Sequence, residues 1–108
     1  MRGSMLVRVV IIFDAELWIW DARRGDSWTF VSLPAEESAD VRELVGMPRR
    51  GFGSLRVWVT VGTSTWATSI FPDTMRGTYV LPVKRAIRQA EGLGAGDIAT
   101  VTVELVDF

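Results

Sequence analysis

Three cationic side chains near the start of a predicted helix are the first candidates for chemistry. Lys84 and Arg85 stand in the first turn, where the positive end of the helix dipole favours carboxylates. Arg88 follows Lys84 by four residues, so both can project near one flank of the helix beside free backbone N–H groups. This pattern predicts a site for a carboxylate or phosphate. The alternative is that Lys84 or Arg85 pairs with a carboxylate such as Asp73, or points into solvent.

Aromatic residues are the second candidate. The chain holds five tryptophans, and Trp18, Trp20 and Trp58 fall at strand positions that alternate with apolar ones and therefore point outward. Either helices and loops cover them, so that they form a second core layer, or they line a pocket or a stacking surface for a planar ligand. A separate alternative is an interaction or accessory module, in which the outward tryptophans form the contact patch for a partner.

Hydroxyl groups recur along a strand predicted over residues 65–71 and can face such a pocket, although threonine and serine are also ordinary on a half-exposed strand. Tyr79 is nearby if the last hairpins pair. We therefore predict a pocket near the start of the second helix that binds a small anionic or aromatic ligand. Its residues are Lys84, Arg88, Tyr79, Ser69, Trp66 and Trp28.

Two missing residue types exclude whole classes of chemistry. The sequence has no cysteine and no histidine, which removes disulfides, thiolate nucleophiles, the commonest zinc ligands and the usual general base near neutral pH. Ser69 has no histidine to activate it as a nucleophile. We expect no metal site and no cofactor, and the formal net charge of -1 points to no class of partner.

The elements that must position these residues follow from apolar periodicity. Alternation predicts six strands, over residues 7–20, 28–33, 54–61, 65–71, 78–81 and 98–106. In the third of these, Leu55, Val57, Val59 and Val61 face inward. Two short helices are predicted, one after Pro34 with carboxylates in its first turns, the other opened by Pro82.

The chain repeats one unit of strand, Leu-Pro, helix and strand, because Leu33-Pro34 matches Leu81-Pro82. Six strands in two such units predict a mainly β protein with two short helices, closed into a small six-stranded β-barrel with an internal pseudo-twofold repeat. A single domain is expected over residues 6–108, after a start, residues 1–5, that reads as an expression scar or a disordered start.

No apolar run is long enough for a membrane span, since residues 9–13 are followed by Asp14 and Glu16. We therefore expect a cytoplasmic protein without membrane contact, either a monomer or a weak homodimer.

Several short motifs together resemble a bacterial family, the domain of unknown function numbered nineteen-oh-five. The motifs are Phe13-Asp14-Ala15, Trp28, Phe30, Leu33-Pro34, residues 68–72 and 79–84, Gly92-Leu93 and Gly96-Asp97. The resemblance spans about residues 10–106 and implies a double-split β-barrel, but no particular activity. Residues 81–103 also resemble, more weakly, the swapped-hairpin half-domain of AbrB-type transcription regulators.

Three functions follow as hypotheses. The first is binding of a small anionic or aromatic ligand in the pocket described above. The second is nucleic-acid binding of the swapped-hairpin type, which requires basic residues to share one face: Arg49, Arg50 and Arg85, with Arg23, Arg24 and Arg88. The third is a cofactor-independent enzyme that shapes a substrate in a hydrophobic cavity.

Overall fold

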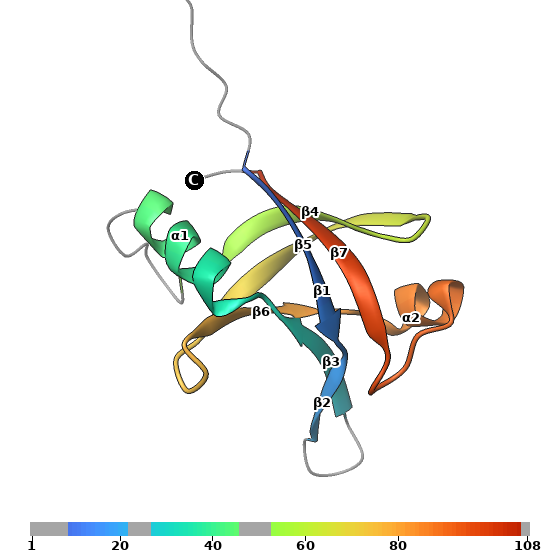
Figure 1. Ribbon diagram of the computed structural model, residues 1–108. Coiled ribbons are helices and arrows are strands. Elements are labelled where there is room, and N and C mark those ends of the chain that lie inside the picture. Colours follow the sequence, from blue (N-terminus) through green and yellow to red (C-terminus); the bar gives the residue numbers. More distant parts are fainter. Residues whose placement is uncertain (1–8, 22–26, 46–52, 107–108) are drawn as a thin grey trace, which may run out of the picture.

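The computed structural model describes residues 9–21, 27–45 and 53–106 (Figure 1). The strands in this part of the chain are β1 (Val10–Glu16), β2 (Trp18–Asp21), β3 (Ser27–Ser32), β4 (Leu55–Val61), β5 (Ser64–Asp73), β6 (Thr78–Pro82) and β7 (Ile98–Leu105). The helices are α1 (Ala35–Val45), which follows β3, and α2 (Arg85–Glu91), which follows β6.

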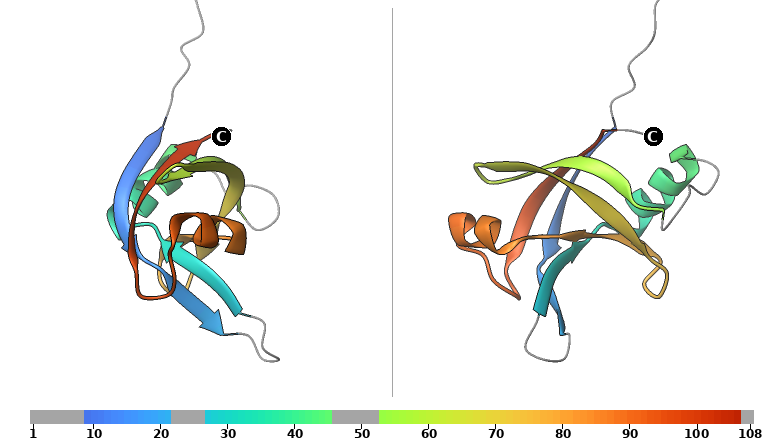
Figure 2. Two further views of the ribbon diagram at one scale, coloured as in Figure 1. Left: turned by 90° about the vertical axis from the view of Figure 1, so that its right-hand side faces the viewer. Right: turned by 180° about the vertical axis from the view of Figure 1, so that it is seen from behind.

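The strands form one sheet in the order β1-β7-β4-β5-β6-β3-β2. All of its pairings are antiparallel. The long strand β5 changes partner along its length: Ser64 to Ile70 pair with β4, and Phe71 to Asp73 pair with β6. Figures 1 and 2 show the sheet curling strongly on itself into an open half-barrel.

The predicted closed six-stranded barrel is wrong. The strand expected over residues 7–20 is two strands, because β1 pairs with β7 whereas β2 pairs with β3. The change occurs at Leu17, whose backbone N–H donates to Asp97 and whose carbonyl accepts from Gly96. The sheet therefore has seven strands, and within the described residues no ladder joins its two end strands, β1 and β2, to close it.

Alternation along the strands places one face of the sheet in the core. The inward positions predicted in β4 are confirmed, since Leu55, Val57, Val59 and Val61 are all buried. β7 contributes four more buried side chains: Ala99, Val101, Val103 and Leu105. These two strands pair side by side and form the centre of the core.

The two helices lie at opposite ends of the sheet (Figures 1 and 2). α1 packs through the buried residues Val41 and Ser38, and α2 packs through Ile87. Neither helix lies over the hairpin formed by β2 and β3 in these views. Among the residues described, neither helix has the length and apolar character needed to cross a membrane.

Strand pairing supports an internal repeat, but it aligns the two halves of the chain differently from the Leu-Pro match in the sequence. Leu33 N–H donates to the Tyr79 carbonyl and Val83 N–H to the Thr29 carbonyl, both at 2.9 Å. The two donors, Leu33 and Val83, are 50 residues apart in the sequence, and so are the two acceptors, Thr29 and Tyr79. The helices begin at residues 35 and 85, which are also 50 residues apart. The match of Leu33-Pro34 with Leu81-Pro82 is therefore displaced by two residues. Pro82 ends β6 and does not open α2, because Val83 is still held by the ladder bond.

Candidate functional site

Four aromatic side chains occupy the outer side of the β2–β3 hairpin. Trp18 lies opposite Phe30 in the ladder, and Trp20 lies opposite Trp28. Thr29, between the two aromatic residues of β3, is buried, so its neighbours on that strand point away from the core. We call Trp18, Trp20, Trp28 and Phe30 the outer aromatic face.

Two members of this face are open to solvent. Trp20 is 54% exposed and Trp28 is 56% exposed, while Trp58, farther along the outer side of the sheet on β4, is 49% exposed. The interpretation that helices and loops cover the outward tryptophans is therefore wrong for Trp20 and Trp58. Exposed aromatic surface of this kind usually marks a contact site.

Trp18 and Phe30 form the base of the outer aromatic face. Their ring centroids are 5.1 Å apart, and the Trp18 indole N–H donates to the Ser32 hydroxyl at 3.0 Å. Trp28 lies nearly parallel to Phe30, with an interplanar angle of 14° and centroids 6.4 Å apart. The hydrogen bond and the ring contacts restrict the orientations of these rings.

The turn between β5 and β6 adds a cation to this face. The Arg76 guanidinium carbon lies 4.1 Å from the centre of the Trp18 ring, a cation–π contact. Its Nη1 donates to Asp73 Oδ2 at 2.8 Å, and this bond holds the pKa of the Asp73 carboxyl below its usual value. Arg76 is thus positioned by both partners.

A shallow hollow opens beside Trp28. We call it the Trp28 hollow, and its volume is about 390 Å³. Arg56 of β4 lies directly opposite Ser69 of β5, and both line the hollow. The lining residues are Trp28, Arg56, Ala67, Thr68, Ser69, Phe71 and Pro82. An aromatic wall therefore meets a cation and a hydroxyl.

A second hollow lies on the other side of Phe30. We call it the Trp20 hollow, and its volume is about 360 Å³. Its lining is Trp18, Trp20, Phe30, Pro72, Asp73, Thr74, Met75, Arg76 and Val80. It resembles the first hollow in combining aromatic rings with one arginine.

A third hollow, of about 350 Å³, lies between β1 and α1. Glu37 and Asp40 of the helix line it together with the apolar residues 9–12 and Val41. Two carboxylates and no cation make it unsuitable for the anion predicted from the sequence.

The family described as "Domain of unknown function (DUF1905)" matches residues 13–103. The chain belongs to this family. The family resemblance predicted from the short motifs is therefore confirmed. No curated protein is similar enough to the chain to count as a match.

In this DUF1905 chain, the fold brings together only two of the six predicted pocket residues, Trp28 and Ser69. Trp66 and Tyr79 belong to the core, with 7% and 5% exposed. Burial raises the pKa of Tyr79, and its backbone N–H is bonded to the Ser38 hydroxyl. Both aromatic side chains lie on the inner side of the sheet, away from the Trp28 hollow.

The cationic residues of α2 also lie apart from that hollow. Lys84 is the N-cap of the helix and is exposed, without a side-chain capping bond. Arg88 is partly buried, and its Nε donates to the Val83 carbonyl at 3.1 Å, so this side chain secures the start of α2. Asp73, the expected partner for Lys84 or Arg85, is bonded to Arg76 instead.

Of the predicted nucleic-acid contacts, Arg85 is exposed on α2. Arg49 and Arg50, like Arg23 and Arg24, lie outside the described residues. The requirement that these arginines share one face therefore stays a prediction.

Sequence reasoning missed Arg56, Arg76 and Phe71 as site residues. Arg56 reads as an ordinary outward residue of β4, and only the register that sets it opposite Ser69 gives it a role. Arg76 sits in a turn, where arginine carries no local signal. The motif of residues 68–72 includes Phe71, and this was the one available hint.

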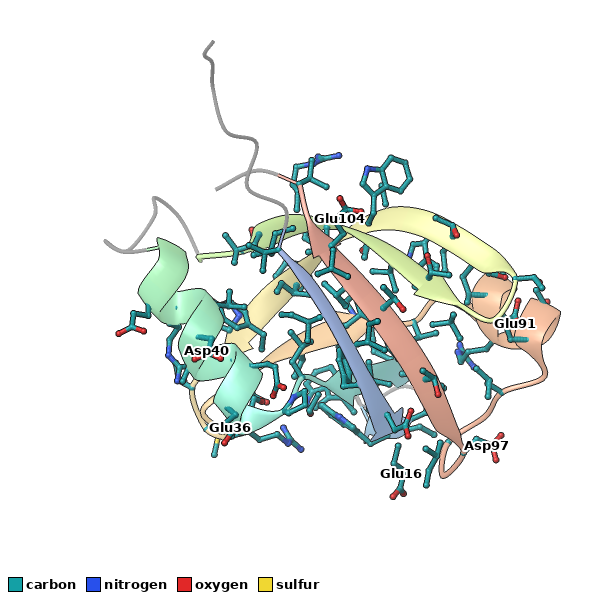
Figure 3. The ribbon with its side chains drawn as sticks, turned by 45° about the horizontal axis from the view of Figure 1, so that its top comes forward. Glu16, Glu36, Asp40, Glu91, Asp97 and Glu104 are labelled. Atoms are coloured by element: carbon teal, nitrogen blue, oxygen red, sulfur yellow. The ribbon has the colours of Figure 1, made fainter. Side chains whose placement is uncertain are left out.

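Carboxylates do not gather into a metal site in the described part of the chain, where no group of three possible ligands comes together. In Figure 3 the six labelled acids, Glu16, Glu36, Asp40, Glu91, Asp97 and Glu104, lie spread around the molecule.

Proposed function

We propose that the chain binds a planar ligand with an anionic group in the Trp28 hollow. The observation that carries this proposal is the position of Trp28, 56% exposed, beside a hollow that Arg56 and Ser69 also line. A ring stacks on the open indole, while the guanidinium takes the anion and the hydroxyl donates a further hydrogen bond.

The volume of about 390 Å³ falls within the range of small-molecule sites. The indole lies nearly parallel to the Phe30 ring, with centroids 6.4 Å apart, and this neighbour limits its reorganisation on binding. Arg56 is the second residue of β4, where it pairs with Ser69 of β5. Its carbonyl accepts a hydrogen bond from the Val106 N–H at 3.1 Å, which restricts its backbone as well. These features favour this hollow over the start of α2, where Arg88 is engaged by a backbone carbonyl.

The chemistry of the lining favours binding over catalysis. Arg56 is the one ionisable residue among those that line the hollow. A guanidinium stays protonated at any physiological pH and cannot act as a general acid or base. We therefore expect a ligand bound in this hollow to be released without chemical change.

Calorimetric titration with two matched probes tests the proposal. Naphthoate is planar and anionic, whereas naphthalenemethanol is planar and neutral. We expect naphthoate to bind more tightly than naphthalenemethanol. Trp28→Ala should lower the affinity for both probes by about tenfold or more. Arg56→Gln should lower the affinity for naphthoate to that for naphthalenemethanol and leave the affinity for naphthalenemethanol unchanged.

Trp58→Ala is the matched control, because Trp58 is also exposed on the outer side but does not line the hollow. It should leave both affinities unchanged. If Trp28→Ala and Trp58→Ala behave alike, or if neither probe binds the native chain, the proposal is wrong.

A further inference from the structure

The outer aromatic face carries two hollows of similar construction, and a ligand that fills one leaves the other empty. We infer that the natural ligand is a single-stranded nucleic acid that places two consecutive bases on this face, one in each hollow. This inference rests on the proposed function of the Trp28 hollow and names the class of its ligand.

The two hollows are neighbours by construction of the sheet. On β3, Trp28 lines one and Phe30 lines the other; on β6, Pro82 and Val80 divide in the same way. Each pair is two residues apart on one face of a strand, a step of about 7 Å. The hollows therefore follow one another along the same strands.

Each hollow offers a ring surface that does not discriminate between bases. Trp28 and Trp20 are the most exposed rings of the outer aromatic face, one for each hollow. They lie opposite each other in the β2–β3 ladder, on one side of the hairpin. Successive bases of a single strand stack on aromatic side chains arranged in this way, and every base has a π-face to offer.

Each hollow also offers one cation for the backbone of the strand. Arg56 serves the Trp28 hollow and Arg76 serves the Trp20 hollow. Arg76 gives one Nη1 donor to Asp73 but is 52% exposed, which leaves other guanidinium donors for a phosphate. The stacked position over Trp18 holds that guanidinium at the surface of the face.

Two arginines imply a binding mode dominated by stacking. For single strands the logarithm of affinity falls with the logarithm of salt by about 0.7 for each phosphate neutralised. The slope expected here is therefore about -1.4, much shallower than for a protein that coats duplex DNA. A formal net charge of -1 is compatible with such a ligand.

The test compares thymidine monophosphate with the 5′-phosphorylated dinucleotide of two thymidines, which carries one phosphate for each base, by quenching of tryptophan fluorescence. We expect the dinucleotide to bind at least tenfold more tightly. Trp20→Ala should lower the affinity for the dinucleotide to that for the mononucleotide. It should leave the affinity for the mononucleotide unchanged. Trp20→Phe keeps a ring at this position and should restore most of the difference. Trp58→Ala is the control and should change neither affinity.

The outcomes separate this inference from the proposed function. If naphthoate binds in the Trp28 hollow but the dinucleotide binds no better than the mononucleotide, the nucleic-acid inference fails and the proposed function stands. If neither naphthoate nor the nucleotides bind, both the proposed function and the nucleic-acid inference are wrong. Binding of a proline-rich peptide on this face, with no binding of the dinucleotide, would also overturn the inference. With an oligonucleotide of eight thymidines, a salt slope steeper than about -3 would mean that phosphate contacts elsewhere dominate, which contradicts the stacking mode.

Discussion

Ser38 is a fully buried polar residue on the inner side of α1. Its hydroxyl accepts a hydrogen bond at 3.0 Å from the backbone N–H of Tyr79, across 41 residues of sequence. The bond joins α1 to β6 and satisfies a strand N–H group that would otherwise be buried without a partner. A small side chain here is thus both packed and bonded.

Replacing Ser38 by alanine should lower the free energy of unfolding by about 1–3 kcal/mol, since the Tyr79 N–H loses its acceptor in the core. Urea denaturation measures this loss. Ser54→Ala is the control, because Ser54 is exposed, and it should change stability by less than about 0.5 kcal/mol. Equal effects of the two substitutions would show that the buried bond contributes nothing.

Gly62 has a backbone conformation and a neighbour that both oppose a side chain. Its φ is +59°, and a Cβ atom built there would meet the Glu91 carboxylate. Gly62→Ala should therefore destabilise the protein by more than about 1 kcal/mol in thermal or urea unfolding. Gly77→Ala is the matched control, with φ +71° and open space around its Cβ position, and should cost less.

A double variant separates the two causes at Gly62. In the Glu91→Ala background the neighbour is gone, so Gly62→Ala should cost about as much as Gly77→Ala does. An excess cost that survives removal of Glu91 would place its origin in the backbone of the turn.

At the scale of elements, Glu91 attaches the end of α2 to the turn between β4 and β5. Its Oε2 accepts bonds from the Thr63 and Ser64 hydroxyls, at 3.2 and 2.5 Å. Figure 3 shows the Glu91 side chain directed from the helix toward this turn. The hydrogen bond from Ser64 is the main cause that holds the pKa of Glu91 below its ordinary value of 4.5.

This lowered pKa predicts how stability depends on acid. The folded state favours the ionised carboxylate more than the unfolded state does, so the contribution is present above pH 4.5 and is lost as the pH falls below it. Unfolding measured from pH 7 to pH 3 should show a steeper loss for the native chain than for Glu91→Gln. Parallel curves for the two proteins would contradict the prediction.

Most of the strands and both helices could be predicted from local sequence. The boundaries that could not be predicted have identifiable physical reasons. Alternation in β4 and β7 is clean because one set of positions is aliphatic throughout. The break at Leu17 has no such signal, since an apolar residue fits both a continuous strand and a junction. Pro82 was mistaken for a helix start because proline suits that position as well as the end of β6.

At the scale of the whole molecule, the candidate site was only partly predictable. Strand β5 mixes polar and apolar residues in both alternation classes, so sequence cannot tell which class faces the core. Pairing with β4 decides it: Trp66 and Ile70 turn inward, and Ser69 turns outward beside Arg56. The outward direction of Trp20 and Trp58 was predicted correctly, but the hollows depend on register between strands distant in sequence.

The half-barrel depends on one junction, because β1 and β2 stand at the two ends of the strand order yet are separated in the chain by Leu17 alone. Leu17 is 1% exposed and belongs to the buried cluster that forms the core of the described residues. Its truncation to alanine should cost about 2–5 kcal/mol through the cavity left behind. Ile12→Ala, at a β1 position that is 66% exposed, is the control and should cost far less.

The same variant tests whether the two ends of the sheet unfold together. Because β1 and β2 anchor opposite ends of the sheet, Leu17→Ala should still unfold in one transition. Far-ultraviolet circular dichroism and tryptophan fluorescence should then give the same midpoint, since the tryptophans lie mainly on β2, β3 and β4. Separate midpoints in Leu17→Ala would contradict this prediction, because they would mean that the two ends of the sheet no longer unfold together once the Leu17 side chain is truncated.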